Sequence, residues 1–199
     1  MTTRLDRTAL HVFLSELVLS ERALAKQYQR AEQRCDDADL KVSMANAADD
    51  AERRADGVEL LLSDLGMDTP AALPLPPVIA AVTLEGTLRD SNARMARYHD
   101  TFGLLMAEEW RRAAVSCLHA VAEVTHNERL STAAVFLDEQ STARIAWLRG
   151  LTACFGTDAL APQRTGTPLP PHPQPPAMRQ NPQRMHEDEF THGPDATPV

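Results

Sequence analysis

Two charged side chains occur where the sequence pattern predicts apolar ones. Residues 4–35 repeat apolar side chains every three or four positions, and Glu21 falls in the middle of that repeat. Arg54 interrupts the apolar repeat of residues 38–65 in the same way. A lone carboxylate in an apolar core would take up a proton or destabilise the fold, unless a metal ion or an arginine lies beside it. Glu21 and Arg54 are therefore the first candidates for a buried site.

The second half of the chain contains a similar combination. Arg144 lies at the centre of the apolar stripe expected for residues 128–155, and Glu109 lies on the flank of the stripe expected for residues 92–125. The stripe of residues 92–125 that we expect to be buried consists of Phe102, Met106, Trp110, Ala113, Cys117, Val121 and Val124.

The spacing along the chain places the members of each combination at the same depth. Glu21 lies 16 residues before a turn near residue 37 and Arg54 lies 17 after it, while Glu109 lies 18 before a turn near residue 127 and Arg144 lies 17 after it. At a helical rise of about 1.5 Å per residue, all four lie roughly 25 Å from their turns. Because a guanidinium stays charged and binds a carboxylate through two hydrogen bonds, we predict structural ion pairs Glu21–Arg54 and Glu109–Arg144. The alternative is that these long side chains reach solvent at the edge of the core.

Four long helices must position these residues. We expect helices over residues 4–35, with Thr3 as N-cap, and over residues 38–65, ending at Gly66. Two more are expected over 92–125 and 128–155, joined by a turn in which Asn127 is the N-cap. A shorter helix is expected within 78–90, in the connection of about 25 residues between the two hairpins. This pattern predicts an all-α four-helix bundle of two antiparallel hairpins with a long crossover.

The bundle is expected to occupy residues 1–160, and the C-terminal tail has a different composition. Residues 161–199 contain ten of the fourteen prolines and few apolar side chains, which predicts a disordered tail with polyproline II character. Residues 168–176 are rich enough in proline to dock into an aromatic-lined groove of a protein partner. An untargeted, solvated tail is the alternative.

Charge and composition exclude several classes of partner. The net charge is -8, so the basic surface of a nucleic-acid-binding protein is not expected, and neither is attraction to anionic lipid. The sequence contains no run of about 18 apolar residues, and a membrane span is not expected. Cys35, Cys117 and Cys154 are odd in number and far apart, which favours a reducing, cytoplasmic location over a disulfide framework.

A four-helix bundle with a long crossover and polar residues at mid-depth on every helix resembles the ferritin-like superfamily, which includes bacterioferritin and rubrerythrin. The resemblance covers about residues 5–155 and includes the phrases AERRADGVELLLSDLG and FLDEQSTARIAWLRGL. Members of that superfamily hold a di-iron or di-manganese centre with one Glu from each of two helices and an ExxH motif from each of the other two.

The resemblance assigns each ligand position to a residue of this chain. Glu21 matches the ligand of the first helix, and Glu109, or the adjacent Glu108, matches that of the third. The two ExxH motifs would lie at residues 51–54 and 141–144, where the chain has Ala51, Arg54, Ser141 and Arg144. The resemblance therefore implies a bundle whose dimetal site is replaced by Glu–Arg pairs. Such a protein would work without a cofactor, as a binding or structural module and not as an enzyme.

Three alternatives remain at this stage. The first is an iron- or manganese-binding stress-response protein of the same superfamily, with ligands drawn from Glu21, Glu52, Glu108 and Glu109. The second is a metal site at the ExxH of Glu123–His126 together with His119. The third is an adaptor bundle unrelated to ferritin, with simple up-down-up-down connectivity. We also expect homo-oligomers, through a second apolar surface formed by Leu14, Val18, Leu104, Val115, Val135 and Ile145.

Overall fold

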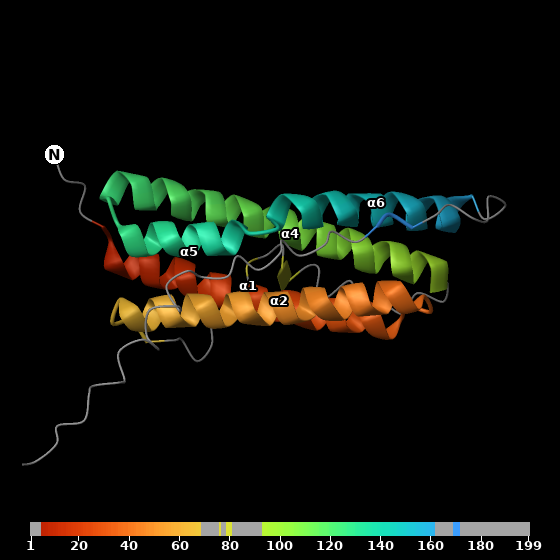
Figure 1. The fold of residues 1–199 in the computed structure, drawn as a ribbon, viewed down its shortest axis with the longest axis horizontal. Helices are drawn as coiled ribbons and strands as arrows, with labels where there is room; N and C mark the ends of the chain where they lie inside the picture. The colour runs from red at the N-terminus through yellow and green to blue at the C-terminus, as the bar shows by residue number, and fades with distance from the viewer. Residues whose placement is uncertain (1–4, 69–75, 77–78, 81–92, 162–168, 172–199) are drawn as a thin grey trace, which may run out of the picture.

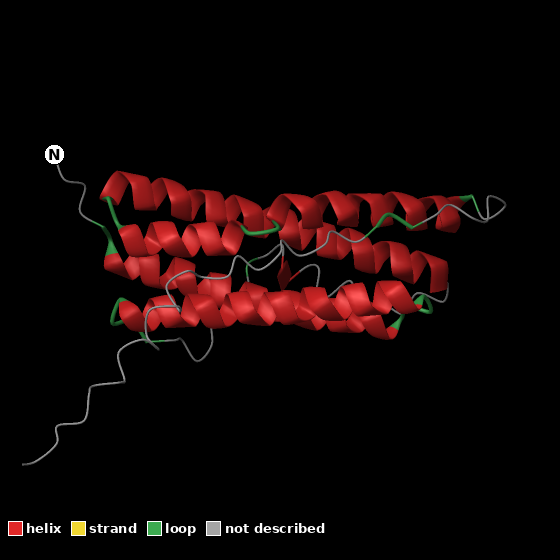
Figure 2. Cartoon of the chain, in the orientation of Figure 1, coloured by secondary structure: helices red, strands yellow, loops and turns green. Residues whose placement is uncertain are grey.

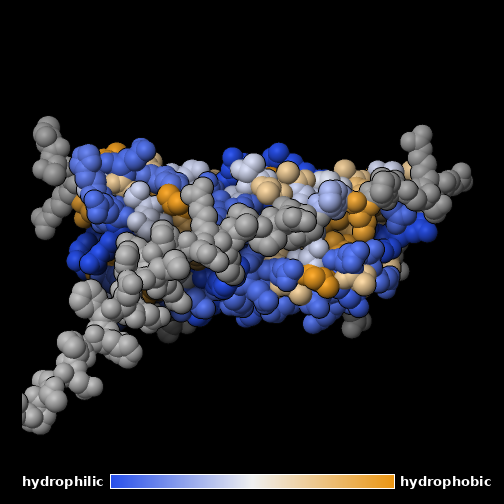
Figure 3. Space-filling view, viewed as in Figure 1, coloured by the Kyte–Doolittle hydropathy of each residue, from blue (hydrophilic) through white to orange (hydrophobic). Residues whose placement is uncertain are grey.

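The protein is a four-helix bundle (Figure 1). The computed structural model describes residues 5–68, 76, 79–80, 93–161 and 169–171. Within these residues, all regular secondary structure is helical (Figure 2), which confirms the all-α prediction. The surface turned to the viewer in Figure 3 is mainly hydrophilic, with separate hydrophobic patches. None of the helices in the described ranges is long and apolar enough to cross a bilayer.

The first hairpin consists of α1, Arg7–Gln33, and α2, Ala38–Asp64. Asp6, and not Thr3, is the N-cap of α1, because its carboxylate accepts hydrogen bonds from the backbone N–H groups of Thr8 and Ala9. Asp37 caps α2 through the N–H of Leu40. Gly66 follows α2 with a φ of 65°, the left-handed conformation that glycine adopts at little cost.

The second hairpin contains three helices in place of the expected two. α4, Ala93–Thr125, forms one arm, and α5, Glu128–Asp138, followed by α6, Ser141–Leu160, forms the other. The continuous helix predicted over 128–155 is therefore wrong. It is interrupted at Gln140, whose φ of 64° is incompatible with a right-handed helix. Asn127 caps α5 through the N–H of Leu130, as the sequence suggested.

The end of α2 and the start of α4 lie at opposite ends of the bundle. Arg34 at the end of α1 pairs with Asp100 near the start of α4 at 2.9 Å, and Arg129 at the start of α5 donates to the carbonyl of Asp64 at the end of α2 at 2.8 Å. α2 and α4 therefore point in the same direction, as Figure 1 shows. Ile79 of the connection is 3% exposed and packs in the core. The short helix expected within 78–90 lies outside the described residues, except for Ile79 and Ala80, which are helical.

The apolar core is divided into two clusters by a polar layer. One cluster contains Leu24, Met44, Leu104 and Leu148, and the other contains Leu17, Val58, Leu118 and Leu137. Every arm of the bundle contributes to both clusters, and the buried charged residues lie between them along each arm. The polar layer is therefore at mid-depth and not at a helix end.

The inward face of α4 differs from the one that the sequence suggested. Phe102, Met106 and Val124 of the expected stripe are 40%, 42% and 59% exposed, and Cys117 is exposed. The buried residues of α4 are instead Thr101, Gly103, Leu104, Ala107, Glu108, Arg111, Ala114, Val115, Leu118 and Ala122. α4 thus has two apolar faces, and periodicity alone does not show which of them meets the other helices.

The second surface expected for oligomer formation is mostly absent, because its residues are core residues of the bundle. Leu14, Val18, Leu104, Val115 and Ile145 are at most 1% exposed, and only Val135, at 62%, lies on the surface. The start of the C-terminal tail also touches the bundle. Leu169 packs against the first cluster, and Pro170 lies so close to Gly150 that a Cβ there would come within 3.0 Å of its ring. The remainder of the expected disordered tail, including most of 168–176, lies outside the described residues.

Candidate functional site: a buried ion network

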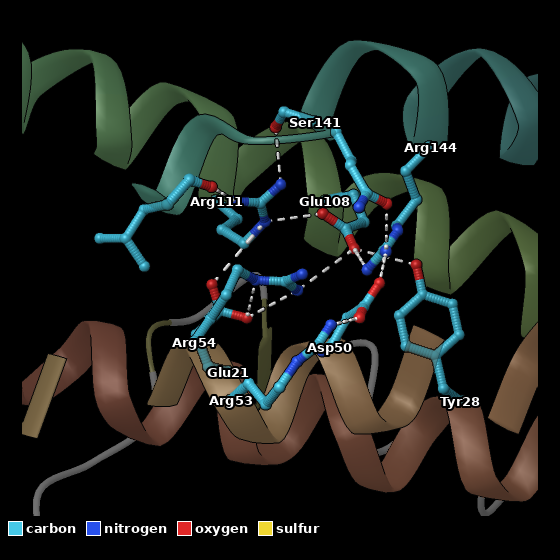
Figure 4. Close-up of polar contacts among 11 residues, drawn as sticks. Glu21, Tyr28, Asp50, Arg53, Arg54, Glu108, Arg111, Ser141 and Arg144 are labelled. Carbon is cyan, nitrogen blue, oxygen red and sulfur yellow. Dashed lines mark hydrogen bonds and ion pairs between the residues drawn. The ribbon is translucent and has the colours of Figure 1, made fainter. Parts of the chain in front are cut away.

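The polar layer is a network of ionised side chains contributed by every arm of the bundle (Figure 4). Glu21 of α1 and Glu108 of α4 are both 0% exposed. Arg54 of α2, Arg111 of α4 and Arg144 of α6 are each at most 5% exposed. Charges buried to this extent are expected only where they are paired or bind a metal ion.

Arg54 bridges the two buried glutamates. Its Nε and Nη2 lie 3.0 Å and 2.9 Å from Oε2 of Glu21, which is a two-point contact with one carboxylate oxygen. The same Nη2 lies 3.7 Å from Oε1 of Glu108. The guanidinium of α2 therefore holds α1 and α4 together across the bundle.

Arg111 forms a second bridge between the same two carboxylates. Its Nε donates to Oε2 of Glu108 at 2.7 Å and lies 3.8 Å from Oε1 of Glu21. The hydroxyl of Tyr28 donates to the other oxygen of Glu108 at 2.9 Å. Both glutamates thus face two guanidinium groups, and the space between the acids is occupied by cations.

Arg144 connects α6 to the network and to α2. Its Nη2 donates to Asp50, and its Nη1 lies 3.9 Å from Oε1 of Glu108. The side chain of Asp50 is 19% exposed and also pairs with Arg53, whose side chain is 65% exposed. Counted together, the three acids Glu21, Asp50 and Glu108 balance the three buried arginines, so the layer carries no net charge.

Arg111 also compensates the interruption that divides the fourth arm into two helices. In a continuous α-helix the carbonyl of Leu137 would accept the N–H of Ser141, and the left-handed Gln140 prevents this bond. Nη1 of Arg111 donates to that carbonyl at 2.6 Å, and Nη2 donates to the hydroxyl of Ser141, also at 2.6 Å. A side chain of α4 thus satisfies the backbone group that the interruption leaves free.

The arrangement fixes the protonation states around Glu108. Burial raises the pKa of this carboxyl, but Arg111, Arg54 and Arg144 outweigh burial and lower the pKa to about 2. Burial lowers the pKa of Arg54, but the negative charges of Glu21 and Glu108 have the larger effect and raise this pKa above its ordinary value. Burial and the charge of Glu108 raise the pKa of Tyr28 well above its ordinary value. At neutral pH Tyr28 is thus a neutral donor and Glu108 an ionised acceptor, which suits a structural network better than proton transfer.

The structure brings together some of the residues singled out in the sequence and separates others. Glu21, Arg54 and Arg144 all lie in the polar layer. Glu109 does not, because it points away from the core and pairs with Arg149 of α6. Consecutive residues of a helix differ by about 100° in direction, so the inward position belongs to Glu108. The pair Glu109–Arg144 is therefore replaced by contacts of Arg144 with Asp50 and Glu108.

Sequence reasoning missed Arg111 and Asp50. The signal for Arg111 was its spacing, since a residue three positions after Glu108 lies on the same helix face and can form an ion pair with it. Once Glu108 had been assigned to the core, Arg111 would have followed. Asp50 offered no comparable signal, because it stands in a run of charged residues that also includes Asp49, Glu52 and Arg53.

The alternative sets of metal ligands are not assembled. Glu52 and Glu109 lie outside the polar layer, so only Glu21 and Glu108 of the first set come near one another. Glu123 and His126 of the second set are exposed at the end of α4. In the part of the chain that the structure describes, no three His, Cys, Asp or Glu residues are grouped so that they could hold a metal ion.

Comparison with known proteins identifies no relative from which a function could be inferred. No family model, no curated protein and no solved structure matches the chain. The polar layer is nevertheless specific: four arms converge on two fully buried carboxylates, and two guanidinium groups bridge them. Because its charges are paired with one another, the layer is suited to hold the four arms together.

The hydroxyl of Tyr28 offers a mild test of the network. Tyr28→Phe should lower the free energy of unfolding by about 1–2 kcal/mol, because Glu108 loses a hydrogen bond in a site without solvent. Urea unfolding at pH 7 measures the change, and Tyr98→Phe, at a half-buried position outside the polar layer, is the matched control. Equal effects of the two substitutions would show that the hydroxyl of Tyr28 contributes nothing specific.

Proposed function

We propose that the chain is a ferritin-like helical bundle in which buried ion pairs take the place of the dimetal centre, and that it acts as a non-catalytic binding or structural module. The observation that carries the proposal is the position of two guanidinium groups between Glu21 and Glu108. A ferritin-like centre would place its metal ions between these two carboxylates. Here Arg54 and Arg111 each contact both of them.

The connectivity of the bundle supports the resemblance. α2 and α4 point in the same direction, so the end of α2 and the start of α4 lie at opposite ends of the bundle. A simple up-down-up-down bundle would instead join antiparallel neighbours by short loops. The adaptor hypothesis expected that simpler connectivity, and the observed one favours the ferritin-like alternative.

The two positions expected for ExxH motifs give further support. Ala51 and Ser141 are 0% and 1% exposed, and Arg54 and Arg144 lie in the polar layer one helical turn later. These four positions therefore face the same layer, as metal ligands would. Substituting arginine for histidine adds a permanent positive charge, which repels a divalent cation at short range.

Other parts of the proposal derive from the sequence. The three cysteines are free, and Cys117 is exposed, which supports a reducing, cytoplasmic location. The module assembles as a homo-oligomer, and the Pro-rich tail recruits a protein partner. Neither nucleic acid nor a membrane is part of the proposed function, since the net charge of -8 disfavours anionic partners.

Metal content tests the proposal directly. Protein purified from cells supplied with iron and manganese should contain far less than one metal ion per chain, as measured by plasma mass spectrometry. Near-stoichiometric metal that is lost on Glu21→Ala would instead establish the iron- or manganese-binding alternative and end the proposal.

Restoring the missing ligands gives the complementary experiment. The quintuple variant Ala51→Glu, Arg54→His, Arg111→Leu, Ser141→Glu, Arg144→His places an ExxH motif on α2 and another on α6 and also removes the second guanidinium that lies between Glu21 and Glu108. It should gain binding of Co²⁺, seen as visible absorption. The control variant Arg54→Met, Arg111→Leu, Arg144→Met removes the same positive charges without adding ligands and should bind none. A folded quintuple variant that binds no metal would count against the ferritin-like resemblance.

A further inference from the structure

The outward face of α4 carries an apolar stripe, of which Trp110 and Val121 also pack partly against the core of the bundle. It consists of eight positions, which we call the outer α4 stripe: His99, Phe102, Met106, Trp110, Ala113, Cys117, Val121 and Val124. None of them is Asp, Glu, Lys or Arg. Phe102, Met106 and Val124 are 40%, 42% and 59% exposed. A continuous uncharged face of this kind on a helix is unusual for a surface in contact with water alone.

The stripe follows a regular repeat. Its positions are separated by 3, 4, 4, 3, 4, 4 and 3 residues, so that the pattern recurs every 11 residues. A repeat of 11 residues corresponds to about 3.67 residues per turn, which keeps the stripe nearly straight along the helix. From His99 to Val124 it extends for about 38 Å at about 1.5 Å per residue. Such a seam is suited to lie along another helix.

The order of the side chains indicates which helix that is. The spacing reads the same in both directions, so an antiparallel pair of α4 helices would align every position of the stripe with one on the other copy. The large residues lie in the first half of the stripe and the small ones in the second half. Phe102 would then face Val121, Met106 would face Cys117, and Trp110 would face Ala113. A parallel pair would place identical residues together, large against large and small against small.

Two grooves extend the stripe on either side. One, of about 510 Å³, lies between α4 and the start of α1, where Val121 and Val124 meet Leu5, Ala9 and Phe13. The other, of about 650 Å³, lies between the first half of α4 and α6, beside Phe102. In the antiparallel arrangement, Phe102 of each copy points toward the first groove of the other. The same surface therefore supplies both the projecting side chain and the groove, as an isologous twofold contact requires.

The stripe alone supplies less area than a specific interface needs, so the two grooves must contribute to the contact. A strip about 38 Å by 10 Å buries roughly 800 Å² over two copies, and the grooves add to it, toward the 1,000 Å² or more typical of specific interfaces. Two copies with a net charge of -8 each repel one another at long range. Contact is therefore favoured on a face without charged side chains.

We propose that two copies of this chain form a twofold dimer through the outer α4 stripe, with the α4 helices antiparallel and Met106 opposite Cys117 of the partner subunit. This dimer rests on the homo-oligomer of the proposed function and gives it a contact surface, but it does not depend on the buried ion network. A monomeric protein would remove the homo-oligomer and leave the metal-content test of the ion network unaffected. The outer α4 stripe replaces the oligomer surface expected from the sequence, which lies mostly inside the bundle.

The mass of the full chain in solution is the first test. Light scattering after size exclusion should give twice the chain mass of 21.9 kDa. Met106→Glu should weaken the dimer about 100-fold or more, because it buries an unpaired charge in the contact. Leu60→Glu, at a 65% exposed position of α2, is the matched control and should remain dimeric. A monomeric wild-type protein, or an unchanged Met106→Glu dimer, would overturn the proposal.

Circular dichroism shows whether a monomeric variant is still folded. If Met106→Glu loses helicity, Val124→Glu makes the same test at a more exposed position of the stripe. A folded Val124→Glu protein that remains dimeric would likewise contradict the proposed contact.

A disulfide test determines the orientation of the two helices. Met106→Cys brings a thiol opposite Cys117 of the partner subunit, so mild oxidation should give a covalent dimer on a non-reducing gel. Adding Cys117→Ser should abolish it, and Val42→Cys, on the exposed face of α2, should not form it. Failure of Met106→Cys to cross-link a dimer, or equal cross-linking of the wild-type chain through Cys117 alone, would exclude the antiparallel arrangement.

Discussion

Glu108→Gln should lower the free energy of unfolding by about 3–5 kcal/mol at pH 7. The substitution preserves the shape of the side chain but removes the negative charge that faces Arg111, Arg54 and Arg144. Arg111 and its neighbours would remain buried with two carboxylates in place of three. Urea unfolding followed by circular dichroism measures the loss.

The same substitution should change how stability depends on pH. The pKa of Glu108 is lowered from its ordinary value of 4.5 to about 2 in the folded protein. A carboxyl with a lowered pKa stabilises the fold above pH 4.5 and loses that contribution as the pH falls from 4.5 to about 2. At 1.36 kcal/mol per pKa unit, the contribution is about 3 kcal/mol. The stability difference between wild type and Glu108→Gln should therefore shrink steadily below pH 4.5.

Glu109→Gln provides the control from the adjacent position. Glu109 pairs with Arg149 at the surface, where the arginine side chain is 62% exposed and the glutamate side chain 34%. Pairs exposed to this degree contribute about 0–1 kcal/mol, so Glu109→Gln should change the free energy of unfolding at pH 7 by no more than that. If Glu109→Gln is as damaging as Glu108→Gln, the orientation of α4 described here is wrong.

The elements of the bundle and half of its polar layer were accessible from the sequence. Glu21 and Arg54 interrupt apolar repeats at equal distances from a turn, and in the structure their side chains are in contact. Arg144 was found in the same way, although its partners are Asp50 and Glu108. Spacing gives depth along a helix reliably, because the rise per residue hardly varies.

The face of a helix that points into the core was harder to predict from the sequence than the depth of a residue along the helix. α4 has one apolar face that meets the bundle and another that meets solvent, and the outward one holds the larger side chains, Phe102 and Met106. Choosing that face moved the inward glutamate by one residue, from Glu108 to Glu109. The interruption at Gln140 could not be predicted either, since no glycine or proline marks it and the bond that compensates it comes from Arg111 of another helix.

The network links the four arms more specifically than the apolar clusters do. Leucine and alanine side chains tolerate small shifts of one helix along another, whereas Arg54 and Arg111 must each lie within reach of two carboxylates on different helices. Buried polar residues can fix the register of packed helices in this way, at some cost in stability. Such a role agrees with a structural module whose surfaces must be held in a fixed arrangement.

Glu21→Ala should cost about 3–5 kcal/mol, and Glu21→Leu combined with Arg54→Leu should cost less than about 1 kcal/mol or stabilise the protein. The single change leaves Arg54 buried without its main partner, while the double change removes one positive and one negative charge together. The remaining pairs, Glu108 with Arg111 and Asp50 with Arg144, stay balanced.

The wild-type pair is also incompletely satisfied, because Oε1 of Glu21 and Nη2 of Arg54 have no hydrogen-bond partner. Chemical unfolding of the three proteins at pH 7 measures both effects. If Glu21→Ala leaves the free energy of unfolding unchanged, Glu21 is not a buried partner of Arg54. If the double variant is as unstable as Glu21→Ala, the ion pair stabilises the fold more than leucine side chains do, and the prediction is wrong.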